Sequence, residues 1–421
     1  MKKLLWLASA LLSIHLTAAA ASANIAANAI NQLGIDLLRQ TKPDQNTVLS
    51  PYSIQSAMAM AYEGADGATR TEMAKVLHYP DNDQIRDSLN ILRKSLEQIA
   101  NNSKASVEEL QKEVNKSFDP FTLSTANRLF GQVGYEFRAP YLSLLKANYD
   151  APFEALDFRS NAAPSAKHIN DWVEQQTHNR IKDLISTTAL NALTRLVLVN
   201  AIYLKAPWME PFKATATKPN TFFLLNAKPV KIPTMVQETA RFGYDNFKDF
   251  VAVTLPYQPS DLQLLIILPK SRTGLGALQT KLSPELLARC SQLQERQIIL
   301  HLPKFKIQPP LFALKDGFEQ LGMKQAFNVP VGSANFDKIA PRHGDDYLYI
   351  SDIFHKTFID VDEKGTEAAA ATSIVIMTMG IHREPPKPIE VRIDHPFLFA
   401  IQHRDTGACL FLGRVTDPTK N

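Results

Sequence analysis

The stretch EKGTEAAAATSIVIMTMGIHREPP, from Glu363 to Pro386, combines conflicting preferences for secondary structure. Ala368 to Ala371 favour a helix, whereas Ser373 to Ile376 include three β-branched aliphatic residues in a row and favour a strand. Two prolines then end either element. The fold must have a place for a segment that can be helix, strand or loop, and no other feature of the sequence constrains it as strongly.

The segment can be divided into two faces if it is taken as a strand from Thr366 onward. The face that starts at Thr366 is small at first, then aliphatic, and carries no charge, so it could enter a hydrophobic core. The face that starts at Glu367 suits the solvent side of a sheet. The alternative is an alanine-rich surface helix that runs into a short strand.

The beginning of the chain has the features of an export signal. Lys2 and Lys3 precede an apolar run, and Ala21-Ser22-Ala23 has the small-x-small form of a cleavage site. We therefore expect residues 1–23 to be removed after Ala23 and the mature protein to be secreted or periplasmic. The lysine-led signal suggests a bacterial source. No later stretch is apolar for long enough to span a membrane.

The charge balance gives no reason to expect a nucleic-acid or membrane partner. The chain has 46 basic and 42 acidic side chains, a formal charge of +4, and loss of the two signal lysines leaves 44 against 42, or +2. Cys290 and Cys409 are the only cysteines, and the sequence leaves open whether they pair or stay free in the core. No linker, charge block or repeat divides residues 24–421, which indicates one large domain.

Helical patterns dominate the first half of the chain, and strand patterns dominate the second half. Helices are expected over 24–40, over 51–64 with Ser50 as N-cap, over 68–77, over 83–116 with a polar break at 101–103, and over 165–186. Strands are expected at 195–204, as a hairpin formed by FVAVTLPY and LQLLIILP, at QIILHLPKFKI, and in four runs after residue 355. The pattern is that of an α+β protein.

Signatures of catalysis are missing from the sequence. It contains no G-x-S-x-G elbow, no H-E-x-x-H helix, no P-loop and no S-x-x-K pair. His301 and His355 fall within strand patterns, where a structural hydrogen bond is the more common role. We expect a protein that is not an enzyme and that needs no metal and no cofactor.

Several segments, in order, resemble the serpin family. They are SPYSIQSAMAMAYEGADGATRTEM, INDWVEQQTHNRIKDLI, LVLVNAIYLKAPWMEPF, ILHLPKF, FIDVDEKGTEAAAA and HPFLFAIQHRDTGACLFLGRV. The resemblance covers essentially the whole mature chain. It implies a single α+β domain over residues 24–421, with about nine helices, three β-sheets, a metastable native state and an exposed reactive-centre loop at about 363–388.

The resemblance also implies a mechanism. A serine protease, or a cysteine protease as the alternative, attacks the loop as a substrate and forms an acyl-enzyme, and the cleaved loop then inserts as a new central strand of a sheet. The protease is carried along and distorted before it can deacylate, so the inhibitor is consumed. A monomer without a cofactor is expected, and the mixed charges of residues 93–116 offer no basic stripe for a polysaccharide.

Three groups of residues match family positions. The hinge of the loop comprises Glu363, Gly365, Thr366, Glu367, Ala368, Ala369, Ala370 and Ala371. The breach, where insertion would begin, comprises Trp208 and Lys304, with Lys304 as the partner of Glu363. The shutter, a polar cluster under the centre of the sheet, comprises Ser50, Ser53, Asn200 and His355. The plainer interpretation of breach and shutter is that they satisfy buried polar groups.

The family's usual distance from hinge to scissile bond, counted from Glu363, implies cleavage between Met379 and Gly380, which resembles sites for elastase-, chymotrypsin- or subtilisin-like proteases. Cleavage at Arg383-Glu384 by a trypsin-like enzyme is the main alternative, with Met377 and Thr378 as lesser ones. Two other functions stay open at this point. A non-inhibitory serpin that acts as a binding or carrier protein would be cleaved without trapping the protease, and an exported hydrolase would show turnover that loop cleavage leaves unchanged.

Overall fold

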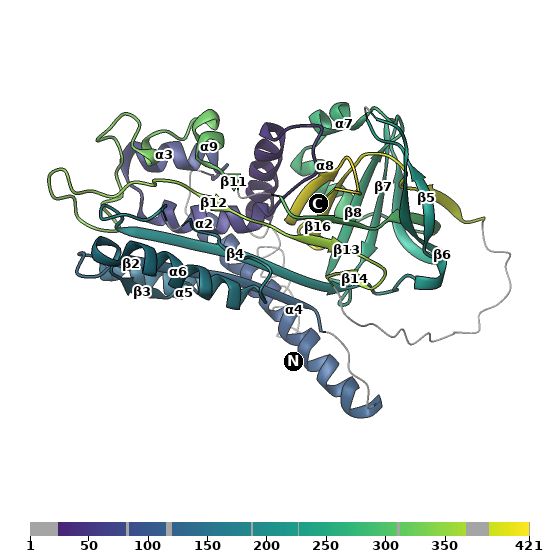
Figure 1. Ribbon diagram of the computed structural model, residues 1–421, viewed down its shortest axis with the longest axis horizontal. Coiled ribbons are helices and arrows are strands. Elements are labelled where there is room, and N and C mark those ends of the chain that lie inside the picture. Colours follow the sequence, from purple (N-terminus) through teal and green to yellow (C-terminus); the bar gives the residue numbers. More distant parts are fainter. Residues whose placement is uncertain are drawn as a thin grey trace, which may run out of the picture.

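The centre of the molecule is a six-stranded sheet with the strand order β10-β13-β14-β4-β2-β3. The computed structural model describes residues 24–80, 84–114, 120–186, 188–225, 227–309, 312–367 and 387–420. The strands are β10 (Phe305–Ile307), β13 (Ile359–Val361), β14 (Gly365–Thr366), β4 (Leu196–Pro207), β2 (Thr122–Gln132) and β3 (Phe153–Leu156). The long strands β2 and β4 run side by side in Figure 1, antiparallel over ten residue pairs. The predicted strand at 195–204 is therefore confirmed.

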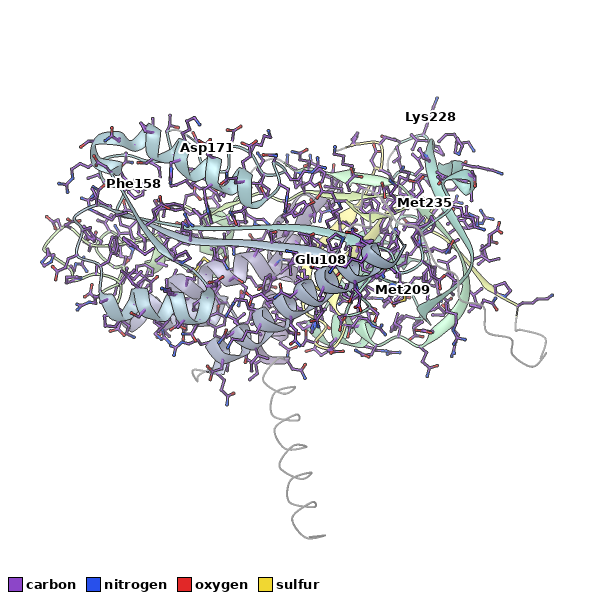
Figure 2. The ribbon with its side chains drawn as sticks, turned by 90° about the horizontal axis from the view of Figure 1, so that it is seen from below. Glu108, Phe158, Asp171, Met209, Lys228 and Met235 are labelled. Carbon is purple, nitrogen blue, oxygen red and sulfur yellow. The ribbon has the colours of Figure 1, made fainter. Side chains whose placement is uncertain are left out.

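The two faces of this sheet pack against different helices. Helix α2 (Pro51–Gly64) contacts β4, and helix α6 (Phe158–Gln176) contacts β2 from the other side. Ile202 and Leu204 of β4 belong to the main core with α2, whereas Val199 and Ala201 belong to a second core with α6. This alternation explains why β4 reads as a continuous apolar run, since both of its faces are covered. Phe158 and Asp171 mark α6 in Figure 2, and Glu108 marks helix α4 (Gln84–Val114).

The start of α2 follows from its sequence. Ser50 has extended backbone angles, its side chain accepts a hydrogen bond from the Ser53 N–H, and Pro51 occupies the first turn. Almost every residue of the helix is buried because it lies between the six-stranded sheet and strand β17 (Cys409–Val415). The side chains of α2 can therefore reach the centre of the sheet.

A second, nine-stranded sheet forms the other half of the molecule, on the right of Figure 1. Its strands are β1 (Thr47–Leu49), β5 (Lys218–Phe222), β6 (Val230–Asn246), β7 (Phe250–Pro256), β8 (Leu262–Pro269), β9 (Glu295–Pro303), β15 (Ile389–Arg392), β16 (Phe397–His403) and β17 (Cys409–Val415). The predicted hairpin is confirmed as β7 and β8, which pair antiparallel, and β8 is buried along its whole length. The runs after residue 355 form strands as predicted.

A short third sheet pairs β11 (Phe312–Ala313) with β12 (Phe354–His355). The remaining helices are residues 24–40, α3 (Gly67–Val76), α4 (Gln84–Val114), α5 (Ala139–Tyr149), α7 (Leu275–Lys281), α8 (Pro284–Ser291) and α9 (Lys315–Leu321). Two single-turn 3-10 helices lie at Ala214–Ala216 and Gln325–Phe327. Across the described ranges there are thus nine α-helices and three sheets, which confirms the predicted α+β architecture.

Two helix predictions were wrong in detail. Helix α4 continues through the expected break at 101–103. Its buried stripe extends to Ile99, and the Ser103 side chain is held in place because it accepts a hydrogen bond from the Phe121 N–H. Helix α6 begins at Phe158, capped by Asp157, and ends at Gln176 instead of residue 186. It stops there because His178 and Asn179 adopt left-handed backbone angles, with φ of 50° and 63°.

Both cysteines are buried and free, which answers the question that the sequence left open. Burial raises the pKa of both thiols to about 12, so they are neutral and unreactive at ordinary pH. Of the helices that the structure describes, none combines the length and apolar character that a membrane span needs.

Candidate functional site

Strand β14 occupies a position between β13 and β4 at one end of the central sheet. Thr366 pairs with Val361 on one side and with Ala206 on the other, and Gly365 pairs with Pro207. The Glu367 N–H then donates to the carbonyl of Asp360 at 2.8 Å. Gly365 and Thr366 of the predicted hinge are therefore already part of the sheet, a state that we call seated.

Gly365 allows this close approach. Its φ is 155°, and a β-carbon at this position would lie only 2.1 Å from the carbonyl oxygen of Ala206. That oxygen is part of the backbone of β4 and cannot move aside without disturbing the sheet. Any larger residue here would push β14 out of its place.

The predicted breach residues surround β14. Lys304 Nζ lies 2.7 Å from Glu363 Oε2, and the Thr217 hydroxyl donates to Glu363 Oε1 at 2.8 Å. Trp208 is buried, and its indole N–H donates to the carbonyl of Asp362 at 2.9 Å. These contacts hold the turn between β13 and β14 against the end of β4.

The charge of Glu363 is maintained by its partners. Burial alone would raise the pKa of this carboxyl, but hydrogen bonds from Lys304, from its own backbone N–H and from Thr217 outweigh burial and lower the net pKa. Glu363 is therefore ionised at neutral pH and forms a salt bridge with Lys304.

Tyr257 is a breach residue that the sequence did not reveal. Its ring stacks on Trp208 with a centroid distance of 4.6 Å and an interplanar angle of 7°. Its hydroxyl lies 2.5 Å from Thr366 Oγ1, inside the core. Thr366 is 2% exposed, so the face of the hinge that was predicted to enter a core does so at its first residue.

The predicted shutter residues form a connected network beneath the sheet. The Ser50 N–H donates to His355 Nε2 at 3.0 Å, and the Ser53 N–H donates to Ser50 Oγ at 3.2 Å. The Ser53 hydroxyl donates to Asn200 Oδ1, and the Asn200 amide donates to Asn127 Oδ1. The network thus links α2, β4, β2 and β12. Asn127 was missed because its register opposite Asn200 in β2 has no signal in the sequence.

His355 accepts the Ser50 hydrogen bond in its neutral form. Complete burial lowers the pKa of the imidazole to about 3, because a charge there would lie in a medium of low polarity. An imidazolium would have no lone pair on Nε2 to accept the bond. The shutter is therefore a network of neutral groups at physiological pH.

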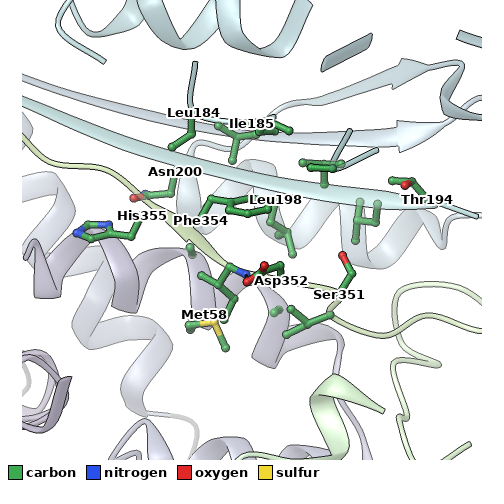
Figure 3. Close-up of a pocket in the computed structure, with 18 of the residues that line it drawn as sticks. Met58, Leu184, Ile185, Thr194, Leu198, Asn200, Ser351, Asp352, Phe354 and His355 are labelled. Carbon is green, nitrogen blue, oxygen red and sulfur yellow. Dashed lines mark hydrogen bonds between the residues drawn. The ribbon is translucent and has the colours of Figure 1, made fainter. Parts of the chain in front are cut away.

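Among the described residues, no strand pairs with β4 where it faces the segment 350–355 across a cavity. In the described part of the chain, only Ala206 and Pro207 of β4 have a ladder partner on the β14 side, whereas the opposite edge pairs with β2 along its length. A cavity of about 120 Å³ lies at the open stretch, which we call the sheet opening. Figure 3 shows Leu198 and Asn200 of β4, Met58 of α2, and Phe354 with His355 around it.

Glu367 contradicts the sequence-based expectation of a solvent-facing side. Its side chain is only 6% exposed and forms an ion pair with Arg180, from the segment that follows α6. That segment covers the face of the sheet on which Glu367 lies. Arg180 was missed because the predicted helix ran through it to residue 186.

Other predicted positions fall outside the described residues. These are the hinge alanines Ala368, Ala369, Ala370 and Ala371 and both candidate cleavage sites, Met379-Gly380 and Arg383-Glu384. In the ranges that the structure does describe, no group of three or more His, Cys, Asp or Glu side chains could hold a metal ion.

Comparisons with known proteins agree with this architecture. The model of the family Serpin (serine protease inhibitor) matches residues 28–418. An uncharacterised serpin-like protein of Thermococcus kodakarensis is 38% identical over 396 residues, which cover 93% of this chain and 85% of that protein. The leukocyte elastase inhibitor of Bos taurus is 34% identical over 391 residues, 90% of this chain and 95% of the relative.

A solved structure described as cleaved serpin 42Da has a TM-score of 0.76 and 33% identity, and the match covers 94% of this chain and 99% of the other. The matching family is one of protease inhibitors and not of enzymes, which confirms that the chain is not an enzyme. The relatives include archaeal and animal proteins, so a bacterial source stays a prediction. With a family model that matches nearly the whole chain, the protein belongs to the serpin family.

Proposed function

We propose that the protein is a secreted or periplasmic suicide inhibitor of serine proteases. The observation that carries this proposal is the position of β14 at the head of the sheet opening. The start of the loop is seated between β13 and β4, and the edge of β4 beyond it has no ladder partner among the described residues. Cleavage of the loop would release residues 368 onward to continue β14 along that edge.

The chemistry follows from the acyl-enzyme. The protease serine attacks the carbonyl of Met379, the peptide bond to Gly380 breaks, and the Gly380 amine leaves. An ester then joins Met379 to the protease. If the loop inserts before water hydrolyses this ester, the protease is displaced and trapped, so inhibition depends on a race between insertion and deacylation.

Residues on the described part of the chain favour insertion. Thr366 begins an uncharged face that would meet the apolar part of the lining of the sheet opening, where Leu198 and Met58 lie. The neutral shutter network can exchange partners without moving a charge through the core. Insertion would add ladder hydrogen bonds to β4 and bury apolar surface, and the uncharged face would bring few polar side chains that lose their contact with water.

The target class rests on the loop and on the relatives. Met379-Gly380 is the proposed scissile bond and suits elastase-, chymotrypsin- or subtilisin-like enzymes, and the bovine relative is named an inhibitor of leukocyte elastase. Arg383-Glu384 is the alternative bond, and it would make a trypsin-like enzyme the target. Cleavage there lengthens the inserted segment and favours turnover over trapping.

The test is to incubate the mature protein separately with elastase, chymotrypsin, subtilisin and trypsin. Denaturing gels and intact-mass analysis then show whether a covalent adduct forms. We expect an adduct with at least one of the first three enzymes and cleavage after Met379. As a control, Thr366→Arg would place a charge against Tyr257 in the core and should be cleaved without an adduct. Clean cleavage of the wild-type protein by all four enzymes would instead support a non-inhibitory serpin.

A further inference from the structure

The segment that follows α6 lies across the hinge and has an unusual backbone. His178, Asn179 and Asp183 all have positive φ, of 50°, 63° and 51°. Such angles are uncommon for residues other than glycine and bring a small conformational cost. They turn the chain back over the central sheet, so that the Arg180 guanidinium lies 5.5 Å from the ring centroid of Phe358, just before β13.

Arg180 meets the last described residue of the hinge. Its Nε pairs with Glu367 Oε1, and the Glu367 side chain is 6% exposed whereas that of Arg180 is 51% exposed. Glu367 has a φ of 54°, so the chain leaves the extended conformation of β14 at this residue. The ion pair therefore lies directly after β14, at the last residue of the hinge that the structure describes.

Other polar groups face Glu367 from the neighbouring strands. From β4, the Tyr203 hydroxyl donates a hydrogen bond to the carboxylate, and the His178 ring packs on the Tyr203 ring at 4.7 Å. From β13, Asp360 repels it, and Lys306 of β10 partly offsets the charge of Asp360. Arg180 is the one cation that pairs directly with Glu367 among the described residues.

Together these groups raise the pKa of Glu367, so seating of the hinge depends on pH. Burial raises the pKa of Glu367 to about 7, and Arg180 opposes the rise without cancelling it. A released, solvated Glu367 would have the ordinary pKa of about 4.5. The seated state is therefore most favoured below pH 4.5 and loses stability as the pH rises through 7.

We propose that Arg180 is the positioning residue for loop insertion, since it supplies the counter-ion that lets a charged Glu367 remain in the sheet, and that seating of the hinge is stronger at mildly acidic pH. This inference rests on the proposed function, because seating matters for inhibition only if the loop inserts. A hinge that is already seated has less distance to travel in the race against deacylation. Arg180 would thus bias the outcome from turnover toward trapping.

Hydrogen exchange of the intact protein tests the proposal without a protease. The Glu367 N–H is protected by its bond to Asp360 when the hinge is seated. We expect the protection factor of this N–H, corrected for the intrinsic exchange rate, to rise about tenfold from pH 8 to pH 6. A tenfold change in the seating equilibrium corresponds in free energy to a shift of one pKa unit. Arg180→Ala should lose about tenfold in protection at pH 8 and recover at pH 6. Glu367→Gln should be protected equally at both values.

The double variant separates a charge effect from a packing effect. In a Glu367→Gln background, Arg180→Ala should leave the protection factor unchanged. In the wild-type background, Arg180→Lys should keep most of the protection at pH 8 that Arg180→Ala loses. Lys182→Ala is the matched control, since Lys182 lies in the same segment but pairs with Glu174. The proposal is overturned if Arg180→Ala lowers protection just as much in the Glu367→Gln background, or if wild-type protection does not respond to pH.

The two proposals fail in different ways. A protease adduct together with pH-independent protection would overturn the inference on Arg180 and leave the inhibitory function standing. Protection that responds to pH and to Arg180, in a protein that never forms an adduct, would support the counter-ion and contradict inhibition.

Discussion

At the scale of single residues, His355 shows how burial in the fold changes the pKa of a side chain in the shutter. Ser50 and His355 are 305 positions apart in the chain, yet the Ser50 N–H donates to the imidazole beneath the sheet opening. Burial lowers the pKa of the imidazole to about 3, well below the ordinary value of 6.5. The unfolded chain binds a proton on His355 near pH 6.5, whereas the native protein does not.

This difference gives a stability that depends on pH. The contribution of neutral His355 to the free energy of unfolding is fully present above pH 6.5 and declines as the pH falls toward 3. Between pH 7.5 and pH 5 this contribution falls by on the order of 2 kcal/mol. His355→Gln keeps an acceptor for Ser50 but removes the titration. Urea unfolding at several pH values should therefore show a flatter decline for the variant. Equal slopes for the two proteins would mean that His355 is not held neutral.

At the scale of elements, β14 is a two-residue strand whose place depends on a glycine. In Gly365→Ala, the new β-carbon would lie 2.1 Å from the Ala206 oxygen, so β14 should be unseated at a cost of at least about 1 kcal/mol, or roughly a fivefold loss of the seated state. The number of inhibitor molecules consumed per trapped protease should rise severalfold.

Gly276→Ala is the matched control for this variant. Gly276 lies in α7, and a β-carbon there would have no neighbour within 4 Å. Titration of protease activity against each protein gives the consumption ratio directly. A Gly365→Ala protein as efficient as the control would show that β14 need not be seated for trapping.

Some of these elements could be predicted from the sequence, and others could not. Strands β7 and β8 and the α2 cap at Ser50 follow from apolar runs, turns and a capping pattern that act over a few residues. The positions of Glu363, Lys304 and His355 in the site came from family resemblance, because contacts over such separations leave no local pattern.

The site residues that the sequence did not reveal depend on strand register and on backbone turns that contain no glycine. Asn127 lies opposite Asn200 only because β2 and β4 align in one particular register. Arg180 reaches Glu367 because α6 ends at Gln176 and the chain turns at left-handed His178 and Asn179, where the polar sequence gives little indication of a stop. Burial of Glu367 follows from that turn, so an alternating pattern alone could not reveal it.

At the scale of the whole molecule, the described part of the native fold leaves favourable contacts unmade. The edge of β4 beyond Ala206 has no described ladder partner toward β14, and the sheet opening retains a cavity of about 120 Å³ lined by apolar side chains and by polar ones such as Asn200 and Asp352. The unpaired edge and the cavity both lower the free energy of unfolding. About ten added strand residues could restore it through hydrogen bonds and packing. The proposed function depends on this reserve, since insertion must release free energy.

Thermal melting before and after a single cut in the loop tests this claim most directly. The protein is cleaved within residues 368–386, the site is confirmed by mass, and intact and cleaved samples are melted side by side. About ten new ladder bonds at about 1 kcal/mol each should raise the Tm by on the order of 10 °C or more. An unchanged or lower Tm in the cleaved protein would contradict insertion of the loop and the account of inhibition built on it.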